Sequence, residues 1–262
     1  DCGVLVLQPP RHRPTHRDGG VVQRAMRKIL GVLRFLGLFI NSMAHAAAVL
    51  LVLLFTRNSR VFHTFCRSWA RVTLTICGVR VQVRGTEHLV PGQGYVYVSN
   101  HASMFDIPAV IAAIPDQIRI VYKKELQWIP LFGWGLKFGS YIAIDRGRSV
   151  KAQKSLEEAI RKIRNGESVL LFAEGTRTLD GKLQAFKRGA FHIAVQAGVP
   201  VVPLTINGSF RILPKHSISI NPGMVELILE RPITLTGEQG KDAELKLMEE
   251  VHAAIARHYV DQ

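Results

Sequence analysis

The chain has 262 residues, of which 34 are Lys or Arg and 20 are Asp or Glu, giving a formal net charge of +14 at pH 7. A hydrophobic share of 47% against a charged share of 21% excludes a disordered chain. Three cysteines are too few for a disulfide framework or a four-ligand zinc site, so we expect reduced thiols. The surplus of positive charge indicates an anionic partner, either nucleic acid or a membrane surface.

The positive charge is concentrated in the N-terminal third. Residues 1–90 hold 13 Lys and Arg against 3 Asp and Glu, a surplus of 10, whereas residues 91–262 hold 21 against 17, a surplus of 4. Residues 1–20 contain three prolines and no apolar periodicity, which predicts a mobile basic tail.

Residues 35–55 form an apolar stretch whose only polar members are Asn41, Ser42 and His45. A helix of these 21 residues would about match the ~30 Å hydrocarbon core of a bilayer. A buried core helix and a secretory signal are the alternatives. Cations flank the stretch on both sides, so the charge pattern does not assign an orientation to a single span.

Residues 60–77 have the pattern of a basic amphipathic helix, with apolar residues at steps of three and four. The apolar members are Val61, Phe62, Phe65, Trp69, Val72 and Ile76, and the arginines expected on the other side are Arg60, Arg67 and Arg71. Residues 21–78 therefore predict a membrane-seated helical hairpin that dips into or spans the bilayer. The alternative is an ordinary domain helix with a solvated basic face. Because the positive charge lies beside an apolar stretch and on an amphipathic helix, it favours a membrane over nucleic acid as the anionic partner.

Residues 79–262 alternate short apolar strands with helices. Strands are predicted at 79–84, 94–98, 118–121, 141–144, 168–173, 199–206 and 225–229, and helices at 107–113, 149–165, 189–197 and 242–259. This alternation predicts an α/β domain with a mixed or largely parallel sheet flanked by helices. In such sheets the chemistry gathers where strands end.

The strand at 94–98 leads directly to His101, and Asp106 follows five residues later. If a helix begins near Ser103, the Asp106 carboxylate can turn back to the imidazole. It would then fix the tautomer and leave the other ring nitrogen as a general base. The alternative is that Ser103 and Asp106 form only a helix capping box.

Polar groups also follow two other strands. Glu174, Gly175, Thr176 and Arg177 follow the strand at 168–173, where an arginine can bind a phosphate and a carboxylate can accept a substrate hydroxyl. A turn closed by a surface Glu–Arg pair is the alternative. Further cations at strand ends would add to an anion site if they converge on it. These are Lys123, Lys124 and Arg146.

The chain has a candidate base but no motif for a protein nucleophile. It contains neither a Gly-x-Ser-x-Gly elbow nor a phosphate-binding Walker loop, and none of its cysteines neighbours a candidate base in sequence. The simplest chemistry for this set is direct transfer, in which His101 deprotonates a substrate hydroxyl that attacks an activated acyl group.

The motif blocks occur in one characteristic order over roughly residues 80–235. They are Asn100-His101-x4-Asp106, Lys123-Lys124-Glu125-Leu126 with Ile129-Pro130-x2-Gly133, then Gly139 to Arg146, Phe172-x-Glu174-Gly175-Thr176-Arg177, and Gly198 to Pro203. In combination they resemble the 1-acylglycerol-3-phosphate O-acyltransferase (lysophosphatidic acid acyltransferase) family. The resemblance implies the glycerolipid-acyltransferase fold and acyl transfer from acyl-CoA or acyl-carrier protein to the sn-2 hydroxyl of 1-acylglycerol-3-phosphate, giving phosphatidic acid in phospholipid synthesis.

The resemblance also implies roles for individual residues. His101 matches the catalytic histidine and Asp106 its orienting partner. The positions associated with the glycerol phosphate are Arg146, Glu174, Gly175, Thr176 and Arg177, with charge added by Lys123 or Lys124. Val202 and Pro203 match the last block, which has acyl-donor or structural roles.

The resemblance further implies no bound cofactor and no metal. No nucleic-acid partner is expected, because the sequence has no recognised nucleic-acid-binding motif. The expected location is the cell inner membrane or another membrane, with an anionic surface as partner and the catalytic domain facing the cytoplasm. We expect backbone amides near the helix after His101 to stabilise the oxyanion.

Two alternatives to this function stay open from the sequence. One is the same chemistry on another lysolipid acceptor, and the other is a non-enzymatic protein that binds anionic membranes. The sequence also does not identify the side chains that line the acyl-chain groove and so select the chain length. Its candidates, which are otherwise ordinary core aromatics, are Phe105, Trp128, Phe132 and Trp134.

Overall fold

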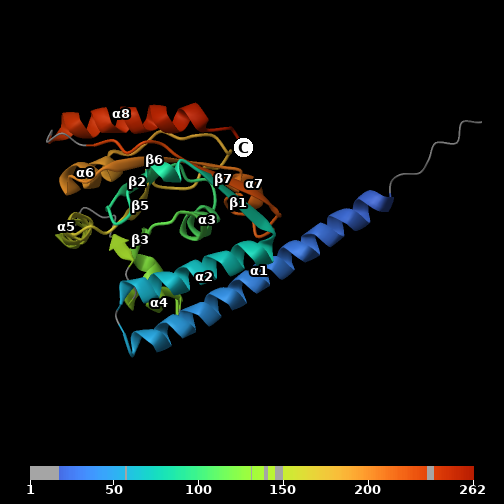
Figure 1. The fold of residues 1–262 in the computed structure, drawn as a ribbon. Coiled ribbons are helices and arrows are strands. Elements are labelled where there is room, and N and C mark those ends of the chain that lie inside the picture. Colours follow the sequence, from blue (N-terminus) through green and yellow to red (C-terminus); the bar gives the residue numbers. More distant parts are fainter. Residues whose placement is uncertain (1–17, 57, 131, 139–140, 145–149, 235–238) are drawn as a thin grey trace, which may run out of the picture.

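The computed structural model describes residues 18–56, 58–130, 132–138, 141–144, 150–234 and 239–262 (Figure 1). Its centre is a seven-stranded sheet in the order β1-β7-β6-β2-β5-β3-β4. Neighbouring strands are parallel except β6 and β7, which are antiparallel, so the predicted mixed sheet is confirmed. The strands are β1 (Val79–Arg84), β2 (Val96–Ser99), β3 (Arg119–Lys123), β4 (Ile142–Ile144), β5 (Val169–Phe172), β6 (Val201–Asn207) and β7 (Gly223–Leu229).

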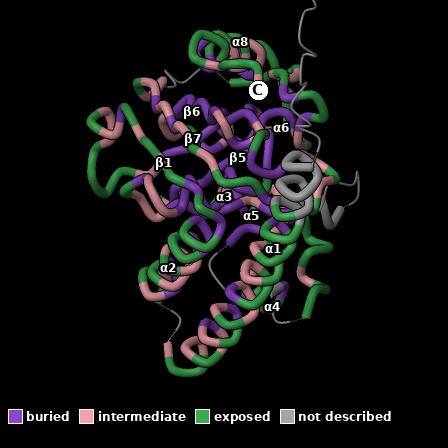
Figure 2. The backbone as a smooth tube through the Cα atoms, turned by 90° about the vertical axis from the view of Figure 1, so that its right-hand side faces the viewer, coloured by how far each residue is buried: buried purple, intermediate pink, exposed green. Residues whose placement is uncertain are grey.

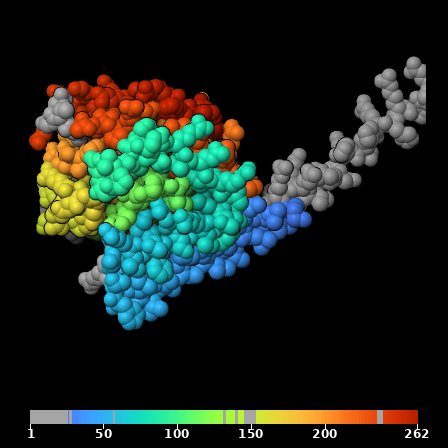
Figure 3. Space-filling view, in the orientation of Figure 1, coloured from blue at the N-terminus to red at the C-terminus, as the bar shows by residue number. Residues whose placement is uncertain are grey.

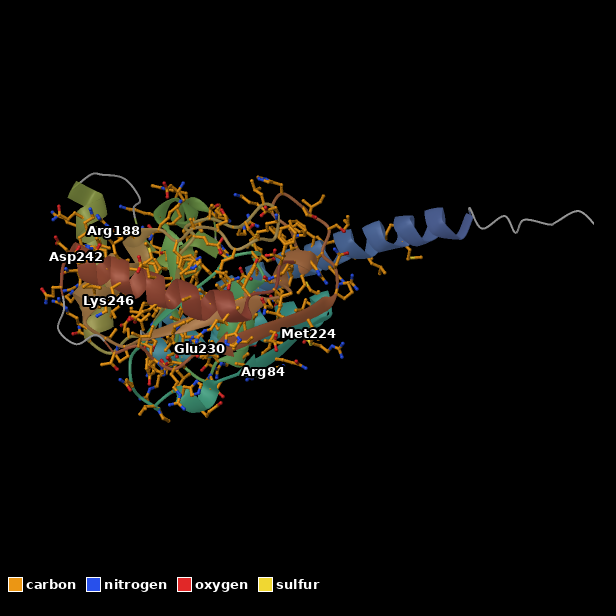
Figure 4. The ribbon with its side chains drawn as sticks, turned by 90° about the horizontal axis from the view of Figure 1, so that it is seen from above. Arg84, Arg188, Met224, Glu230, Asp242 and Lys246 are labelled. Carbon is orange, nitrogen blue, oxygen red and sulfur yellow. The ribbon has the colours of Figure 1, made fainter. Side chains whose placement is uncertain are left out.

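Helices cover both faces of this sheet. The four predicted in the α/β domain are α3 (Asp106–Ala113), α5 (Val150–Arg164), α6 (Arg188–Ala197) and α8 (Lys241–His258). Four short elements were not predicted: α4 (Phe132–Phe138), α7 (Ser209–Ile212), and the 3-10 turns η1 (Thr86–His88) and η2 (Lys124–Trp128). Helices α5, α6 and α8 pack on one face, and α3 packs on the other. Seen from above, α8 crosses the sheet, and Arg188 of α6 lies near its first turn (Figure 4).

Strand β2 shows why the sheet is buried on both faces. Val96 and Val98 pack among α6 and α8, whereas Tyr97 points to the opposite side, among α3 and the N-terminal helices. Successive residues of a strand point to opposite faces of the sheet. All three side chains are inaccessible to solvent, because helices cover both faces. Figure 2 shows the central strands as buried.

The two N-terminal helices form a hairpin below the α/β body (Figure 3). They are α1 (Asp18–Leu53) and α2 (Ser59–Cys77), and α1 begins inside the segment predicted as tail; residues 1–17 lie outside the described residues. Residues 29–53 of α1 are long and apolar enough to cross a membrane, with a mean hydropathy of 2.0. Only 17% of the most apolar window is buried within the protein.

The polar residues of the apolar stretch all face α2. Asn41 donates to the Trp69 carbonyl at 3.2 Å and to the Thr73 hydroxyl at 2.9 Å. Trp69 in turn donates its indole N–H to Ser42 at 3.0 Å. Nε2 of His45 lies 3.2 Å from a serine hydroxyl of α2. The side chains that interrupt the apolar stretch thus join the two helices, which leaves large apolar side chains exposed elsewhere on α1.

The predicted faces of α2 are partly wrong. Arg67, expected on the basic outer side, reaches inward and donates to the carbonyl oxygens of Ile111, at 3.2 Å, and Ile114. The reason is that α2 packs against both α1 and α3, so the face it buries is rotated from the simple apolar stripe.

Candidate active site

The site forms where β2 and β5 end. These neighbouring strands are parallel, with Ser99 opposite Phe172, and the amide of Ala173 donates to the carbonyl of Ser99 at 3.0 Å. This register brings the residues that follow β2, including His101, beside those that follow β5, including Glu174. Two blocks about 70 positions apart in the sequence therefore meet at one edge of the sheet.

His101 and Asp106 are in direct contact, with 2.7 Å between Nδ1 and Oδ2. Asp106 is fully buried, and the His101 side chain is 16% exposed. The carboxylate favours a proton on Nδ1, which leaves Nε2 as the basic nitrogen for a substrate hydroxyl. This geometry is what a histidine general base needs.

Asp106 also binds the backbone that precedes α3, whose first residue it is. Its Oδ2 accepts the backbone N–H groups of Ala102 and Ser103, each at 2.9 Å. The contact between Ser103 and Asp106 and the histidine contact thus coexist, but neither residue is the N-cap of α3, which is Phe105 and makes no side-chain cap hydrogen bond. The expectation that amides just after His101 stabilise an oxyanion is wrong for these two, because both already donate to Asp106. The amide of Phe105 donates to the Ser103 hydroxyl at 3.3 Å.

Glu174 holds the backbone of His101. It is 2% exposed; its Oε1 accepts the His101 N–H at 2.9 Å, and its Oε2 accepts from the Gln184 amide at 2.8 Å. Burial raises the pKa of Glu174 to about 7, helped by the charge of Asp106, while the two hydrogen bonds act in the opposite direction. Both oxygens are thus engaged within the protein, and the predicted contact of Glu174 with substrate stays a prediction.

Further contacts fix the position of His101. Its ring stacks on Phe172 with centroids 3.8 Å apart and 13° between the planes. Its carbonyl accepts the N–H of Thr178 at 2.9 Å. The preceding Asn100 is buried and exchanges two hydrogen bonds with the backbone of Ile206 in β6, at 2.8 and 2.9 Å. The imidazole is therefore oriented before any substrate binds.

The loop after β5 gathers cations that the sequence did not single out. Gly175 has φ of +70°, and a Cβ there would lie 3.0 Å from the Lys187 side chain. Lys215 donates from Nζ to the Thr176 hydroxyl at 3.1 Å and to the Arg177 carbonyl at 3.3 Å. No local pattern marks Lys187 or Lys215, because only the tertiary fold brings them to this loop. Arg177, in the same loop, is half-buried.

The other predicted ligands lie farther out or inside the sheet. Lys123 and Lys124 are exposed at the carboxyl end of β3, where Lys123 pairs with Glu125 at 3.3 Å. Strand β3 is separated from β2 by β5, roughly 10 Å away at typical strand spacing. Arg146 lies outside the described residues. Val202 and Pro203 are buried in β6 beside β2.

Neither metal nor thiol chemistry is suggested by the described residues. They contain no group of three or more His, Cys, Asp and Glu side chains able to hold a metal ion. Cys66 and Cys77 are free thiols, and burial raises the pKa of each to about 11, which keeps them protonated near neutral pH. The His101–Asp106 pair stays the predicted chemical centre of this site.

Comparison with known proteins identifies the family. The family model described as Acyltransferase matches residues 80–207, a range that includes His101, Asp106 and the loop after β5. Residues 80–207 form a domain of the acyltransferase family. The resemblance seen in the sequence blocks is thereby confirmed, and relatives of this family carry the matching name.

Two relatives illustrate the match. The chain is 36% identical over 185 residues to the chloroplastic 1-acyl-sn-glycerol-3-phosphate acyltransferase BAT2 of Brassica napus, covering 70% of this chain and 53% of that one. It is 29% identical over 256 residues to the 1-acyl-sn-glycerol-3-phosphate acyltransferase of Cocos nucifera, covering 95% and 82%. The chain thus spans about half the length of the Brassica relative.

A solved acyltransferase structure has the same fold. The crystal structure of the 1-acyl-sn-glycerophosphate (LPA) acyltransferase PlsC from Thermotoga maritima matches with a TM-score of 0.75 and 27% identity. The match covers 89% of this chain and 95% of that one. The predicted acyltransferase fold is therefore confirmed.

Proposed function

We propose that this chain transfers an acyl group from a thioester, acyl-CoA or acyl-carrier protein, to the sn-2 hydroxyl of 1-acylglycerol-3-phosphate and so forms phosphatidic acid. The observation that carries the proposal is the 2.7 Å contact between His101 and a fully buried Asp106 in a domain of the acyltransferase family. Relatives named 1-acyl-sn-glycerol-3-phosphate acyltransferases support this acceptor.

The reaction needs one base and no protein nucleophile. Nε2 of His101 accepts the proton of the acceptor hydroxyl while its oxygen attacks the thioester carbonyl. The tetrahedral intermediate collapses, the carbon–sulfur bond breaks, and the imidazolium returns the proton to the leaving thiolate. The carboxylate of Asp106, 2.7 Å from Nδ1, stabilises the imidazolium between these two steps.

The acceptor phosphate binds at the loop after β5. Arg177 offers a two-pronged contact to a phosphate, and Lys215 is already held against Thr176 and the Arg177 carbonyl. Lys187, whose side chain lies against Gly175, adds a third cation. The family resemblance implies that Arg146 also binds the glycerol phosphate and that Lys123 or Lys124 adds positive charge there, and the proposal keeps these roles.

A membrane holds the acceptor at the depth of this site. Lysophosphatidate keeps its phosphate in the headgroup layer and its tail in the hydrocarbon, so an enzyme that acts on it must sit at that interface. Helix α1, with an exposed apolar surface over residues 29–53, supports this arrangement. The proposed location is an anionic membrane, such as a cell inner membrane, with the α/β domain facing the cytoplasm.

Acceptor competition tests the function. Purified protein in phospholipid vesicles receives a radiolabelled acyl thioester, as acyl-CoA or acyl-carrier protein, together with lysophosphatidate, lysophosphatidylcholine or monoacylglycerol. We expect labelled phosphatidic acid to be the main product. Equal or greater turnover of monoacylglycerol, which has no phosphate, would overturn the acceptor assignment. Comparing the two donors at equal concentration identifies the preferred carrier.

A further inference from the structure

The connection between β3 and β4 exposes a cluster of large apolar side chains. Five of them lie within residues 126–138, and we call this set the aromatic ledge. Its members are Trp128 (83% exposed), Phe138 (59%), Trp134 (45%), Ile129 (43%) and Leu126 (37%). Trp128 and Trp134 were candidate walls for an acyl chain, but exposed rings do not enclose one. Large apolar side chains exposed together on neighbouring elements mark an interaction surface.

The aromatic ledge belongs to a segment that packs beside α1. Helix α4 packs directly on α1: a Cβ at Gly135 would lie 3.9 Å from the Cβ of Ala46. Figure 1 shows α4 beside the N-terminal hairpin. Ala46 belongs to the part of α1 that is apolar enough to enter a membrane, and large side chains such as Phe39 and Ile40 are more than half exposed there. Two neighbouring helices thus both expose large apolar side chains.

The composition of the ledge points to a lipid surface. Tryptophan is enriched where membranes meet water, because its ring is apolar and its N–H needs a polar neighbour. Lysines border the ledge at both ends: Lys123 and Lys124 precede it, and Lys137 places Nζ 5.3 Å from the ring centre of Phe138. Lysines beside an apolar surface attract anionic headgroups.

We propose that η2 and α4, residues 124–138, form a second membrane-contacting surface, in which the aromatic ledge enters the headgroup layer of an anionic phospholipid bilayer beside α1. This inference rests on the proposed function for the orientation of the chain at the membrane. It adds a lipid contact next to Lys123 at the carboxyl edge of the sheet. Together, the aromatic ledge and α1 then hold the carboxyl edge of the sheet at the depth of the lipid headgroups.

Depth-dependent quenching of tryptophan fluorescence tests the contact. The chain has three tryptophans, so Trp69→Phe with Trp134→Phe leaves Trp128 as the reporter. The vesicles contain phosphatidylcholine and phosphatidylglycerol, with bromine on the upper acyl chain of a fraction of the lipids. We expect a blue shift and a loss of roughly half or more of the Trp128 emission, as for a ring seated at the interface.

A matched control places the reporter on the opposite side of the sheet. Met224 is 47% exposed, and its neighbour Val225 packs toward α2 and α3, so Met224 points to the α8 side (Figure 4). In a chain with all three native tryptophans changed to Phe, Met224→Trp should show no bromine quenching. Equal quenching at both positions, or none at Trp128, would overturn the proposal.

Two further outcomes separate this inference from its rivals. If the Trp128 emission shifts with protein concentration in the absence of vesicles, a second copy of the chain covers the ledge and the proposal fails. The quenching needs no catalysis, so a protein that shows it but transfers no acyl group would contradict only the proposed function. Trp128→Ser with Phe138→Ser should slow acyl transfer on vesicles several-fold and leave transfer to a short-chain, fully soluble acceptor unchanged.

Discussion

The carboxylate of Glu174 accepts the backbone N–H of His101 at 2.9 Å, which ties the loop after β5 to the candidate base at the end of β2. The family resemblance assigns Glu174 to acceptor binding, and in the structure Glu174 also fixes the backbone of His101 at the edge of the sheet. Because Glu174 is buried, the protonation state of its carboxyl is coupled to stability.

The first prediction concerns the pH dependence of stability. The pKa of Glu174 is about 7 in the folded chain, above its ordinary value of 4.5. The folded chain therefore binds more protons than the unfolded chain between these values, and this residue lowers the free energy of unfolding as pH rises from about 4.5 to 7. Glu174→Gln, which keeps an oxygen for the His101 N–H, should remove this loss.

Thermal unfolding at several pH values measures the effect. The melting temperature of Glu174→Gln minus that of the wild type should increase as the pH rises from 5 to 8. A constant difference across that range would show that Glu174 does not titrate there.

The second prediction concerns Asp106. Asp106→Asn can keep an oxygen in the place of Oδ2 for its three N–H donors, but it removes the charge that stabilises the imidazolium. We expect acyl transfer to fall by roughly 10²- to 10⁴-fold, the range typical of a disrupted general base. The rate is measured with labelled thioester, and circular dichroism checks that the variant is folded. A folded variant with the wild-type rate and pH profile would rule out this role.

The third prediction concerns Lys215. Its ammonium group lies on the loop that carries Arg177, so Lys215→Met should raise the KM for lysophosphatidate by roughly tenfold, as loss of one charge-assisted hydrogen bond implies. The KM for a phosphate-free acceptor should not change. Lys241→Met, at the exposed start of α8, is the charge-matched control. Equal effects of the two variants would mean that Lys215 acts only through net charge.

The fourth prediction concerns the inward arginine of α2. Arg67→Met removes the donors to Ile111 and Ile114 at the end of α3 and should cost about 1–3 kcal/mol of unfolding free energy. Arg71→Met, on an exposed position of the same helix, should change stability by less than about 0.5 kcal/mol. Chemical denaturation of both variants gives the comparison. If the two costs are equal, the contact with α3 does not contribute to stability.

Much of the fold follows from local sequence pattern. All seven strands lie within two residues of the expected ends, because each is a short apolar run between turn residues. The helix α4 was missed, since Phe132–Phe138 contains two glycines and no amphipathic repeat, and packing on α1 stabilises it. The faces of α2 were misassigned because a sequence stripe does not reveal that a helix has two packing partners.

The candidate site was predictable only in part. The contact of His101 with Asp106 follows from their spacing around a helix start, and the structure has it. The clamp of Glu174 on the His101 backbone depends on the register of β2 with β5, which no local pattern encodes. For the same reason Lys187 and Lys215, distant in sequence from the motifs, were not anticipated.

Product analysis with wild-type protein and His101→Ala tests the central claim most directly. Each protein is incubated with lysophosphatidate and a labelled acyl thioester, and the lipid product is identified by mass spectrometry. The account predicts phosphatidic acid from the wild type and a rate lower by roughly 10²- to 10⁴-fold for His101→Ala. Formation of phosphatidic acid at the same rate by a folded His101→Ala protein would contradict it.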